Sequence, residues 1–583
     1  MAPGPDNNRP SIVQDQAIDT TMQELSKSQR ARNAIRTFKI LADALTLQGA
    51  YKPSGKTGEK LAEALKMFSP EIYGSMADPR IVELKGLEYV IDRMPRGIEK
   101  CNRIILTAQE DFQDTAFEEI IPLKRRRVSY AVSDKEMCFV ITHGQSEIYD
   151  ILTHITFLTI ESQKILQQIS NRVDGTSTEW IELERIIDHE AELKDDQLDQ
   201  ALWNLSIILG RTYKETRNTY DYLDGNRRLH NSNSGLFNIV HTLGRRMIEE
   251  QISGKEELTI YFTPSLQEMI GHHRYASLWA SSIKEKLYDL GFQDRPLHVI
   301  SANMHSVRNT LYGSGMLLAN GEAVPDDLYA MVGQLRSQGR RISEYAEKFG
   351  YTFHKDTSGS NIDVNIIDTS RIDTATLHPA LRFNLELITA QQPVLLVMDY
   401  AFGTQAFELM DELLCPCQIQ DKVISFSIES ISVMGKAGIL PGKKGDIMLA
   451  TAHVMEGTPH NYIVNNDLTV DDFDPGVNVY CGPMVTVLGT SLQNRDVLER
   501  FHSSSWKAVG LEMEGGHYQR AISAAIIQGH IPMGMKTRYA YYASDNPLQS
   551  GQTLASGPMG EEGIVPTYMI TKVILQKILN YQE

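Results

Sequence analysis

The chain has 583 residues, which is too long for one ordinary hydrophobic core and favours two domains. Hydrophobic residues make up 42% of it and charged residues 22%, which excludes collagen-like, disordered and coiled-coil descriptions of the whole chain. A formal net charge of -17 disfavours a general nucleic-acid-binding protein, because neutralising phosphates requires clustered lysine and arginine. A small anionic ligand remains compatible with this composition.

Compartment and cofactors follow from a few residue types. The 5 cysteines include no Cys-x-x-Cys pair, so we expect a reducing compartment without disulfides. The first residues lack the apolar core of a signal peptide, and no run of about 18 apolar residues occurs. We therefore expect a cytoplasmic protein without a membrane partner. His143 and His154 have no carboxylate or cysteine at metal-ligand spacing, so we expect no metal and no cofactor.

The N-terminal part shows helical periodicity. Residues 1–24 are rich in proline, asparagine and aspartate and are predicted to be a flexible tail. Residues 25–255 are predicted to form a mainly α-helical domain, because apolar residues recur at spacings of three and four. The first helix is expected to end at Gly49, which suits a C-cap. Further helical patterns cover residues 86–94, 146–169 and 198–223.

From about residue 256 onward, short runs of apolar and β-branched residues alternate with amphipathic helices. Residues 256–583 are therefore predicted to form an α/β domain, in which helices flank a largely buried sheet. Ligands of such sheets bind where the strands end, so polar residues that follow the strands are candidate site residues. The expected strands cover residues 258–264, 297–303, 363–369, 393–403, 423–435, 446–454, 484–490 and 535–545.

Glycines follow two of these strands. Gly403 comes after PVLLVMDY and before a helix, where it either lets the backbone approach a ligand or makes a tight turn. In VMGKAGIL, Gly435 and Gly438 could open a slot for a planar base.

Carboxylates lie at two further strand ends. In AVGLEMEGG, a carboxylate of Glu512 or Glu514 can accept hydrogen bonds from both hydroxyls of a ribose, while Met513 packs on the sugar. Glutamate at the start of a helix also has a purely structural explanation, the helix dipole. Asp545 ends the run YAYYASD and either shapes a turn or acts as a buried acid that protonates a leaving base.

Taken in order, these segments resemble successive motifs of the nucleoside phosphorylase and nucleosidase superfamily, which includes purine nucleoside phosphorylases, methylthioadenosine nucleosidases and AMP nucleosidase. The resemblance covers residues 394–575 and extends more faintly back to residue 258. It implies a phosphorylase-like mixed sheet flanked by helices and a homo-oligomer. The segments are VMGKAGIL, GDIMLATAHV, GTSLQNRDVLERF, AVGLEMEGGHYQRA and YYASDNPL.

The resemblance also implies roles for single residues. It assigns Met513 and Glu514 to the ribose, and it assigns protonation of the purine N7 to Asp545 with support from Ser544. Thr490 and Ser491 lie where related enzymes shape the base pocket. The complete set of candidate substrate-binding residues is Met513, Glu512, Ser544, Gly403, Gly435, Gly438, Thr490 and Ser491, with Asp545 and Glu514 as the catalytic pair.

Three functions remain open at this stage. The first is a nucleosidase that hydrolyses the N-glycosidic bond of a purine nucleoside or nucleotide. The second is a phosphorylase that uses phosphate instead of water. The third is a catalytically silent nucleotide-binding sensor, because the superfamily's early phosphate-binding loop is not recognisable and His305 and Arg308 are only candidate replacements.

Overall fold

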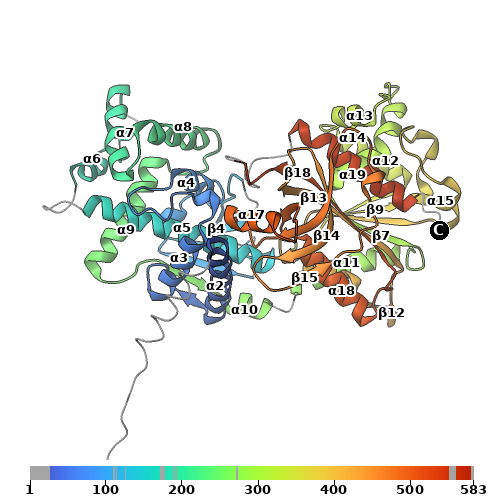
Figure 1. Cartoon of the computed structure of the whole chain (residues 1–583), viewed down its shortest axis with the longest axis horizontal. Helices are drawn as coiled ribbons and strands as arrows, with labels where there is room; N and C mark the ends of the chain where they lie inside the picture. Colours follow the sequence, from blue (N-terminus) through green and yellow to red (C-terminus); the bar gives the residue numbers. More distant parts are fainter. Residues whose placement is uncertain are drawn as a thin grey trace, which may run out of the picture.

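The structure is a computed structural model. It describes residues 26–108, 112, 115–124, 127–170, 177–187, 189–190, 193–270, 273–549 and 560–579. The tail predicted for residues 1–24 lies outside the described residues. Two halves lie side by side, the N-terminal one rich in helices and the C-terminal one built around a large sheet (Figure 1).

The helices of the N-terminal half begin with α2 (Lys27–Gln48). A capping box at Ser26 starts this helix, and Gly49 ends it with a φ of 86°, which confirms the predicted C-cap. The expected helix over residues 198–223 is two helices, because Gly210 ends the first with a φ of 63°. The other helices are α3 (Lys56–Phe68), α4 (Leu84–Ile91), α5 (Gly144–Ser170), α6 (Thr178–Ile186), α7 (Asp195–Leu209), α8 (Tyr213–His230), α9 (Leu236–Ser253) and α10 (Pro264–Met269).

This half also contains a sheet, which the sequence pattern does not predict. Six described strands pair in the order β1-β6-β2-β5-β4-β3. They are β1 (Ala50–Tyr51), β2 (Arg103–Thr107), β3 (Glu118–Glu119), β4 (Val128–Ser133), β5 (Glu136–Val140) and β6 (Thr259–Phe262). The run predicted as the first strand of the C-terminal sheet is therefore β6 of this sheet, between β1 and β2. Periodicity over four or five residues reports burial, but it does not identify the neighbouring strand.

The large sheet is mixed, in agreement with the predicted α/β fold. Its ten described strands follow the order β15-β14-β16-β17-β13-β7-β10-β9-β8, and β18 pairs with β13 and β14. The strands are β7 (Leu297–Ser301), β8 (Tyr351–His354), β9 (Val364–Asp368), β10 (Val394–Met398), β13 (Ile428–Ile439), β14 (Ile447–Met455), β15 (Asn461–Ile463), β16 (Val479–Thr486), β17 (Gly510–Glu512) and β18 (Lys536–Asp545). A small hairpin of β11 (Cys417–Ile419) and β12 (Lys422–Ile424) lies apart.

Helices cover both faces of this sheet (Figure 1). One face carries α12 (Met304–Ala319), α13 (Leu328–Gln334), α14 (Gly339–Ala346) and α19 (Ile564–Leu579). The other carries α11 (Arg274–Asp289), α16 (Gln405–Leu414) and α18 (Gly515–Gln528). Helix α15 (Leu385–Gln391) packs with the first group, and α17 (Arg495–Ser503) lies between the two halves. Among the described residues, no helix has the length and apolar character needed to cross a bilayer.

The two halves share a hydrophobic core. Helix α17 packs against α2, and α16 contacts α5, so elements distant in sequence meet along one seam (Figure 1). Fully buried residues of both halves, among them Phe38 and Val497, belong to a single apolar cluster. Burial of this kind stabilises by about 25 cal/mol per Å² of apolar surface, so the seam holds the halves in a defined arrangement.

Candidate active site

A cavity of about 330 Å³ lies where β7, β10 and β17 end, beside the middle of β13. Its volume falls at the lower end of the roughly 300 to 1,000 Å³ typical of small-molecule sites. Five of the predicted residues line it, namely Gly435, Thr490, Glu512, Met513 and Glu514. The strand-end argument therefore locates the cavity, although most of its aromatic wall was not predicted.

The aromatic wall surrounds Gly435. A side-chain carbon added to this glycine would lie 3.7 Å from the ring of Tyr541 and 3.8 Å from that of Tyr400. Phe402 and Tyr518 also line the cavity. Gly435 thus leaves open the space between these aromatic rings, and flat rings of this kind stack on planar groups. A larger residue at position 435 would project between the tyrosines.

Glu512 uses its carboxylate within the protein. One oxygen, Oε1, accepts hydrogen bonds from Thr486 Oγ1 at 2.5 Å and from His453 Nδ1 at 3.2 Å. The other accepts from the backbone amides of Glu514 and Gly515 at the start of α18. Burial would raise the pKa of Glu512, but the hydrogen bonds from His453, Thr486 and the Gly515 amide outweigh it and hold the pKa below its usual value. Glu512 thus holds the β17–α18 junction together.

Glu514 lies at the N-cap position of α18 and lines the cavity. Its Oε1 accepts a hydrogen bond from the backbone amide of Gly403 at 3.0 Å. Gly403 has a φ of 54°, and a side-chain carbon there would lie 2.2 Å from Ser146 Oγ of the N-terminal half. Gly403 therefore orients Glu514 from a tight turn and does not itself line the cavity, which is the second of its two predicted roles.

Asp545 is fully buried at the end of β18. Its Oδ1 accepts a hydrogen bond from Ser544 Oγ at 2.6 Å, and Oδ2 has no hydrogen-bond partner among the described residues. Burial raises the pKa of Asp545, while the Ser544 hydroxyl and the charges of Lys436 and Lys444 offset part of this rise. Asp545 is not in the cavity wall, but Lys436, whose charge acts on it, is.

Three other predicted residues lie outside the cavity lining. A side-chain carbon on Gly438 would lie 2.8 Å from Leu511 and 3.3 Å from Pro547, so this glycine permits close packing of β13 on β17 and opens no slot. Ser491 is buried outside the cavity lining. Ser544 contacts Asp545 and is likewise outside the lining.

The candidate phosphate residues on α12 also lie outside the cavity lining. His305 Nδ1 lies 3.2 Å from Tyr568 Oη. Arg308 donates a hydrogen bond to Ser343 Oγ at 2.9 Å. These contacts join α12 to α19 and α14 and give no support for a phosphate site at this position.

The N-terminal half reaches the cavity through α4. Tyr89 Oη lies 3.0 Å from Thr490 Oγ1, and the guanidinium of Arg93 stacks 3.7 Å above the ring of Tyr89. Burial lowers the pKa of Lys436, the charge of Asp545 opposes this shift, and the positive charge of Arg93 adds to it. Sequence reasoning missed Tyr89, Arg93 and Lys436. Of these, only Lys436, which lies inside the VMGKAGIL motif, carried a local signal.

The cavity has the character of an organic ligand site. Aromatic rings form much of its wall, and carboxylate, ammonium and hydroxyl groups are placed around them. Within the part of the chain that the structure describes, no three histidine, cysteine, aspartate or glutamate side chains cluster as a metal site would require.

These features define an α/β protein with a cavity beside the ends of β7, β10 and β17. The chain belongs to a family of unknown function (DUF6909), whose model matches residues 59–329 and 328–580. No curated protein sequence matches it.

Among solved structures, isoform 2 of uridine phosphorylase from Schistosoma mansoni in complex with citrate is 12% identical, covers 50% of this chain and 91% of its own, and has a TM-score of 0.28. The 5′-methylthioadenosine/S-adenosyl homocysteine nucleosidase of Campylobacter jejuni is 10% identical and also has a TM-score of 0.28. The match covers 49% of this chain and 100% of the nucleosidase. A nucleosidase from Colwellia psychrerythraea 34H in complex with adenine is 13% identical and has a TM-score of 0.28. The match covers 49% of this chain and 96% of that nucleosidase. Similarity at this level says nothing about the chemistry of the cavity, which has to be argued from its own residues.

Proposed function

We propose that this protein cleaves the N-glycosidic bond of a purine nucleoside or nucleotide and releases the free base. The observation that carries the proposal is the arrangement around one cavity: a carboxylate, Glu514, held in its wall by the Gly403 amide, an aromatic slot at Gly435, and a buried acid, Asp545, whose pKa is influenced by Lys436 of the wall. Each element matches one requirement of the reaction, namely a grip on the sugar, a place for the base and a proton for the leaving group.

Glu514 is the proposed ribose ligand. A carboxylate accepts hydrogen bonds from two neighbouring hydroxyls, and the adjacent Met513 offers an apolar surface to the sugar. As the C1′–N9 bond lengthens, positive charge develops on the ribose. The attraction to Glu514 then grows, so the carboxylate stabilises the transition state more than the ground state.

Asp545 is the proposed general acid. Its raised pKa favours the protonated form, whose proton passes to N7 of the base through one water between Asp545 and the cavity, while the bonding electrons of C1′–N9 move into the ring. Water then attacks C1′ and loses a proton, which completes the hydrolysis. The carboxylate left on Asp545 is stabilised by the nearby charge of Lys436. General acid catalysis of this kind contributes on the order of 10² to 10⁴ in rate.

The phosphorylase alternative is favoured by one observation. Lys436 places an ammonium group in the cavity wall, and such a group can bind a phosphate oxyanion as well as stabilise Asp545. Phosphate would then attack C1′ in place of water. The two reactions differ in a single requirement, since only phosphorolysis depends on added phosphate.

The alternative of a nucleotide-binding sensor is favoured by the full burial of Asp545 outside the cavity lining. In that case the cavity binds a nucleoside or nucleotide without releasing base. Substitution of Asp545 would then leave ligand affinity nearly unchanged.

Release of free base from AMP, adenosine, methylthioadenosine and inosine, with and without phosphate, tests these three functions. Asp545→Asn should lower base release by about 10²-fold or more, because its side chain cannot donate a carboxylic proton. Asp496→Asn on the exposed surface of α17 is the matched control and should retain full activity. Absence of base from every substrate, with measurable binding, would refute the enzyme and favour the sensor.

A further inference from the structure

A second cavity, of about 220 Å³, lies on the seam between the two halves. Its wall combines the start of α5 and the end of α10 from the N-terminal half with α16 and the first turns of α18 from the C-terminal half. It is therefore formed only when the two halves are docked. At this volume it is smaller than the roughly 300 to 1,000 Å³ of a site for a drug-sized molecule, so its occupant must be small.

His517 is the first sign of an occupant. This side chain lies in the first turn of α18, is only 7% exposed and lines the cavity. Its imidazole makes no hydrogen bond with any described residue, whereas its backbone amide donates to the Glu514 carbonyl. Burial lowers the pKa of His517 to about 4, which leaves a neutral imidazole with one donor and one acceptor. A buried polar group without a partner costs free energy unless a ligand or water satisfies it.

The charges around the cavity favour an anion. Arg520, one turn beyond His517 on α18, lies 4.2 Å from the centre of the Phe407 ring, and no described carboxylate forms an ion pair with it. Helix α5 begins at the cavity with Gly144, and its positive end, partly offset by the Glu147 carboxylate of its first turn, adds to the charge of Arg520. In a chain with a net charge of -17, an arginine without a carboxylate partner beside a cavity is informative.

Glu408 of α16 supplies the opposing group. Its side chain lines the cavity, and burial raises its pKa to about 7. At and below neutral pH a large share of this carboxyl is protonated, so it can donate a hydrogen bond to an oxyanion. Ile148 and Leu266 add an apolar side to the cavity.

We propose that this seam cavity, formed by Arg520, His517, Glu408 and the first turn of α5, binds a small organic anion, either a carboxylate or a phosphate monoester. The arginine and the helix N-terminus hold the anionic group, and His517 and the protonated Glu408 provide hydrogen bonds. The apolar side accommodates a short carbon chain.

The seam cavity is linked to the first cavity through one short loop. Thr404 lines the seam cavity, and its backbone amide donates a hydrogen bond to Ser146 Oγ at 2.9 Å. The preceding residue, Gly403, donates to Glu514 at 3.0 Å. A ligand at Thr404 and His517 would thus stiffen the segments that orient Glu514. Its effect on turnover rests on the proposed function, whereas anion binding itself does not.

Titration calorimetry of the full chain with succinate, glycerol 3-phosphate and orthophosphate at pH 6.5, without nucleoside, tests the site directly. We expect saturable binding of succinate or glycerol 3-phosphate, weakened about tenfold or more by Arg520→Gln, since a charge-assisted hydrogen bond is lost. Arg340→Gln, which removes an exposed arginine on α14 far from the seam, is the charge-matched control and should bind as the unchanged protein does.

Each outcome decides a separate question. Absence of binding by all three anions, or equal binding by Arg520→Gln, would overturn the seam site. Binding of orthophosphate alone would overturn the organic ligand. Asp545→Asn should keep full anion affinity, so a failure of base release would leave the result of this experiment intact.

Discussion

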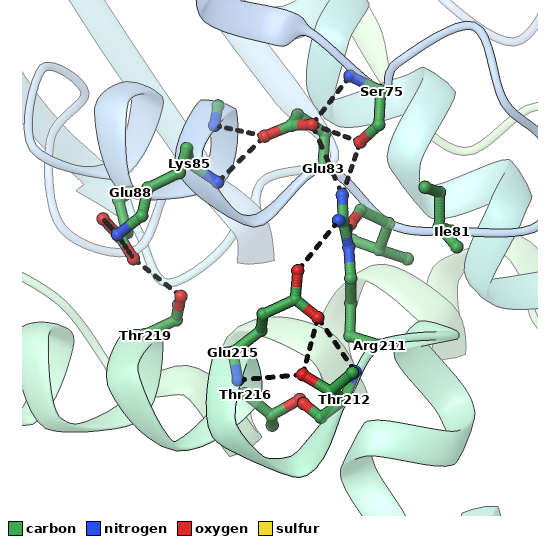
Figure 2. A network of polar contacts seen from close by, with 12 residues as sticks. Ser75, Ile81, Glu83, Lys85, Glu88, Arg211, Thr212, Glu215, Thr216 and Thr219 are labelled. Atoms are coloured by element: carbon green, nitrogen blue, oxygen red, sulfur yellow. Dashed lines mark hydrogen bonds and ion pairs between the residues drawn. The ribbon is translucent and has the colours of Figure 1, made fainter. Parts of the chain in front are cut away.

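Two polar regions of the molecule differ in how completely their buried polar groups are hydrogen-bonded. In the N-terminal half, Glu83 accepts hydrogen bonds from the backbone amides of Ser75 and Lys85 at 2.8 and 3.0 Å and forms an ion pair with Arg211 at 3.4 Å (Figure 2). Glu88 and Glu215 in the same region are also bonded to neighbouring side chains. The cavity next to this network measures only about 100 Å³.

The strand-end cavity leaves polar atoms unused. Tyr541 lines it with a buried hydroxyl that has no hydrogen-bond partner among the described residues. Oδ2 of Asp545, which is buried outside the cavity lining, also has no such partner. A satisfied network stabilises a fold, whereas buried groups without partners cost stability and are retained where a ligand uses them. The comparison therefore predicts that substitutions in the network affect stability and substitutions at the cavity affect turnover.

The largest expected effect is on catalysis. Glu514→Gln should lower kcat/KM for base release by about 10²-fold or more, because the side chain loses the charge that attracts the developing cation of the ribose. The melting temperature should change little. Steady-state kinetics of this variant are compared with those of Glu499→Gln, which changes an exposed carboxylate that forms an ion pair with Arg495 on α17. Equal activity of the two variants would contradict the role assigned to Glu514.

A large effect on stability is expected in the network. Glu83→Ala removes the N-cap of α4 and leaves Arg211 without this carboxylate. The free energy of unfolding should therefore fall by about 3 kcal/mol. Denaturant titration measures this change. The KM for the nucleoside should stay within about twofold of the original value. A change in KM without a loss of stability would break the distinction between the two regions.

A smaller and pH-dependent effect is expected at the seam, where Glu456 has both carboxylate oxygens buried without hydrogen-bond partners among the described residues. Burial raises its pKa to about 8, partly opposed by Arg32. The folded protein therefore holds this proton more tightly than the unfolded chain, and stability falls as pH rises from about 4.5 to about 8. Glu456→Gln should remove this fall and gain about 1 kcal/mol at pH 8. Thermal unfolding at several pH values measures it, and an unchanged pH profile would refute the prediction.

The smallest expected effect concerns the proposed anion site. Glu408→Gln should strengthen succinate binding a few-fold at pH 8, since the neutral amide no longer repels the anion. It should also flatten the dependence of binding on pH around 7, where Glu408 titrates. The other charged or titratable groups lining the site are His273, Arg274, Tyr275, His517 and Arg520, and Glu408→Gln retains all of them. Weaker binding at pH 8 would show that Glu408 acts as a carboxylate ligand.

Several parts of the site could be predicted from local sequence. Asp545 ends a buried strand, and Glu514 lies at a strand-to-helix junction. Both positions could be predicted because short apolar runs followed by polar residues identify strand ends. The contribution of Tyr89 could not be predicted, since it lies 401 residues from Thr490, its hydrogen-bond partner. Gly435 and Gly438 occur in one motif, yet only Gly435 faces the cavity, because Leu511 fills the space beside Gly438.

The sequence by itself predicted β7, β9, β10, β13, β14 and β18 and the end of α2 at Gly49, because these depend on periodicity and on backbone preferences of nearby residues. Only the tertiary structure decided that β6 joins the first sheet, that Glu512 caps α18 while Glu514 faces the cavity, and that a second cavity forms at the seam. Strand partners, hydrogen-bond partners and cavities all arise from contacts between distant segments. Local periodicity records that a residue is buried, but it carries no record of what covers it.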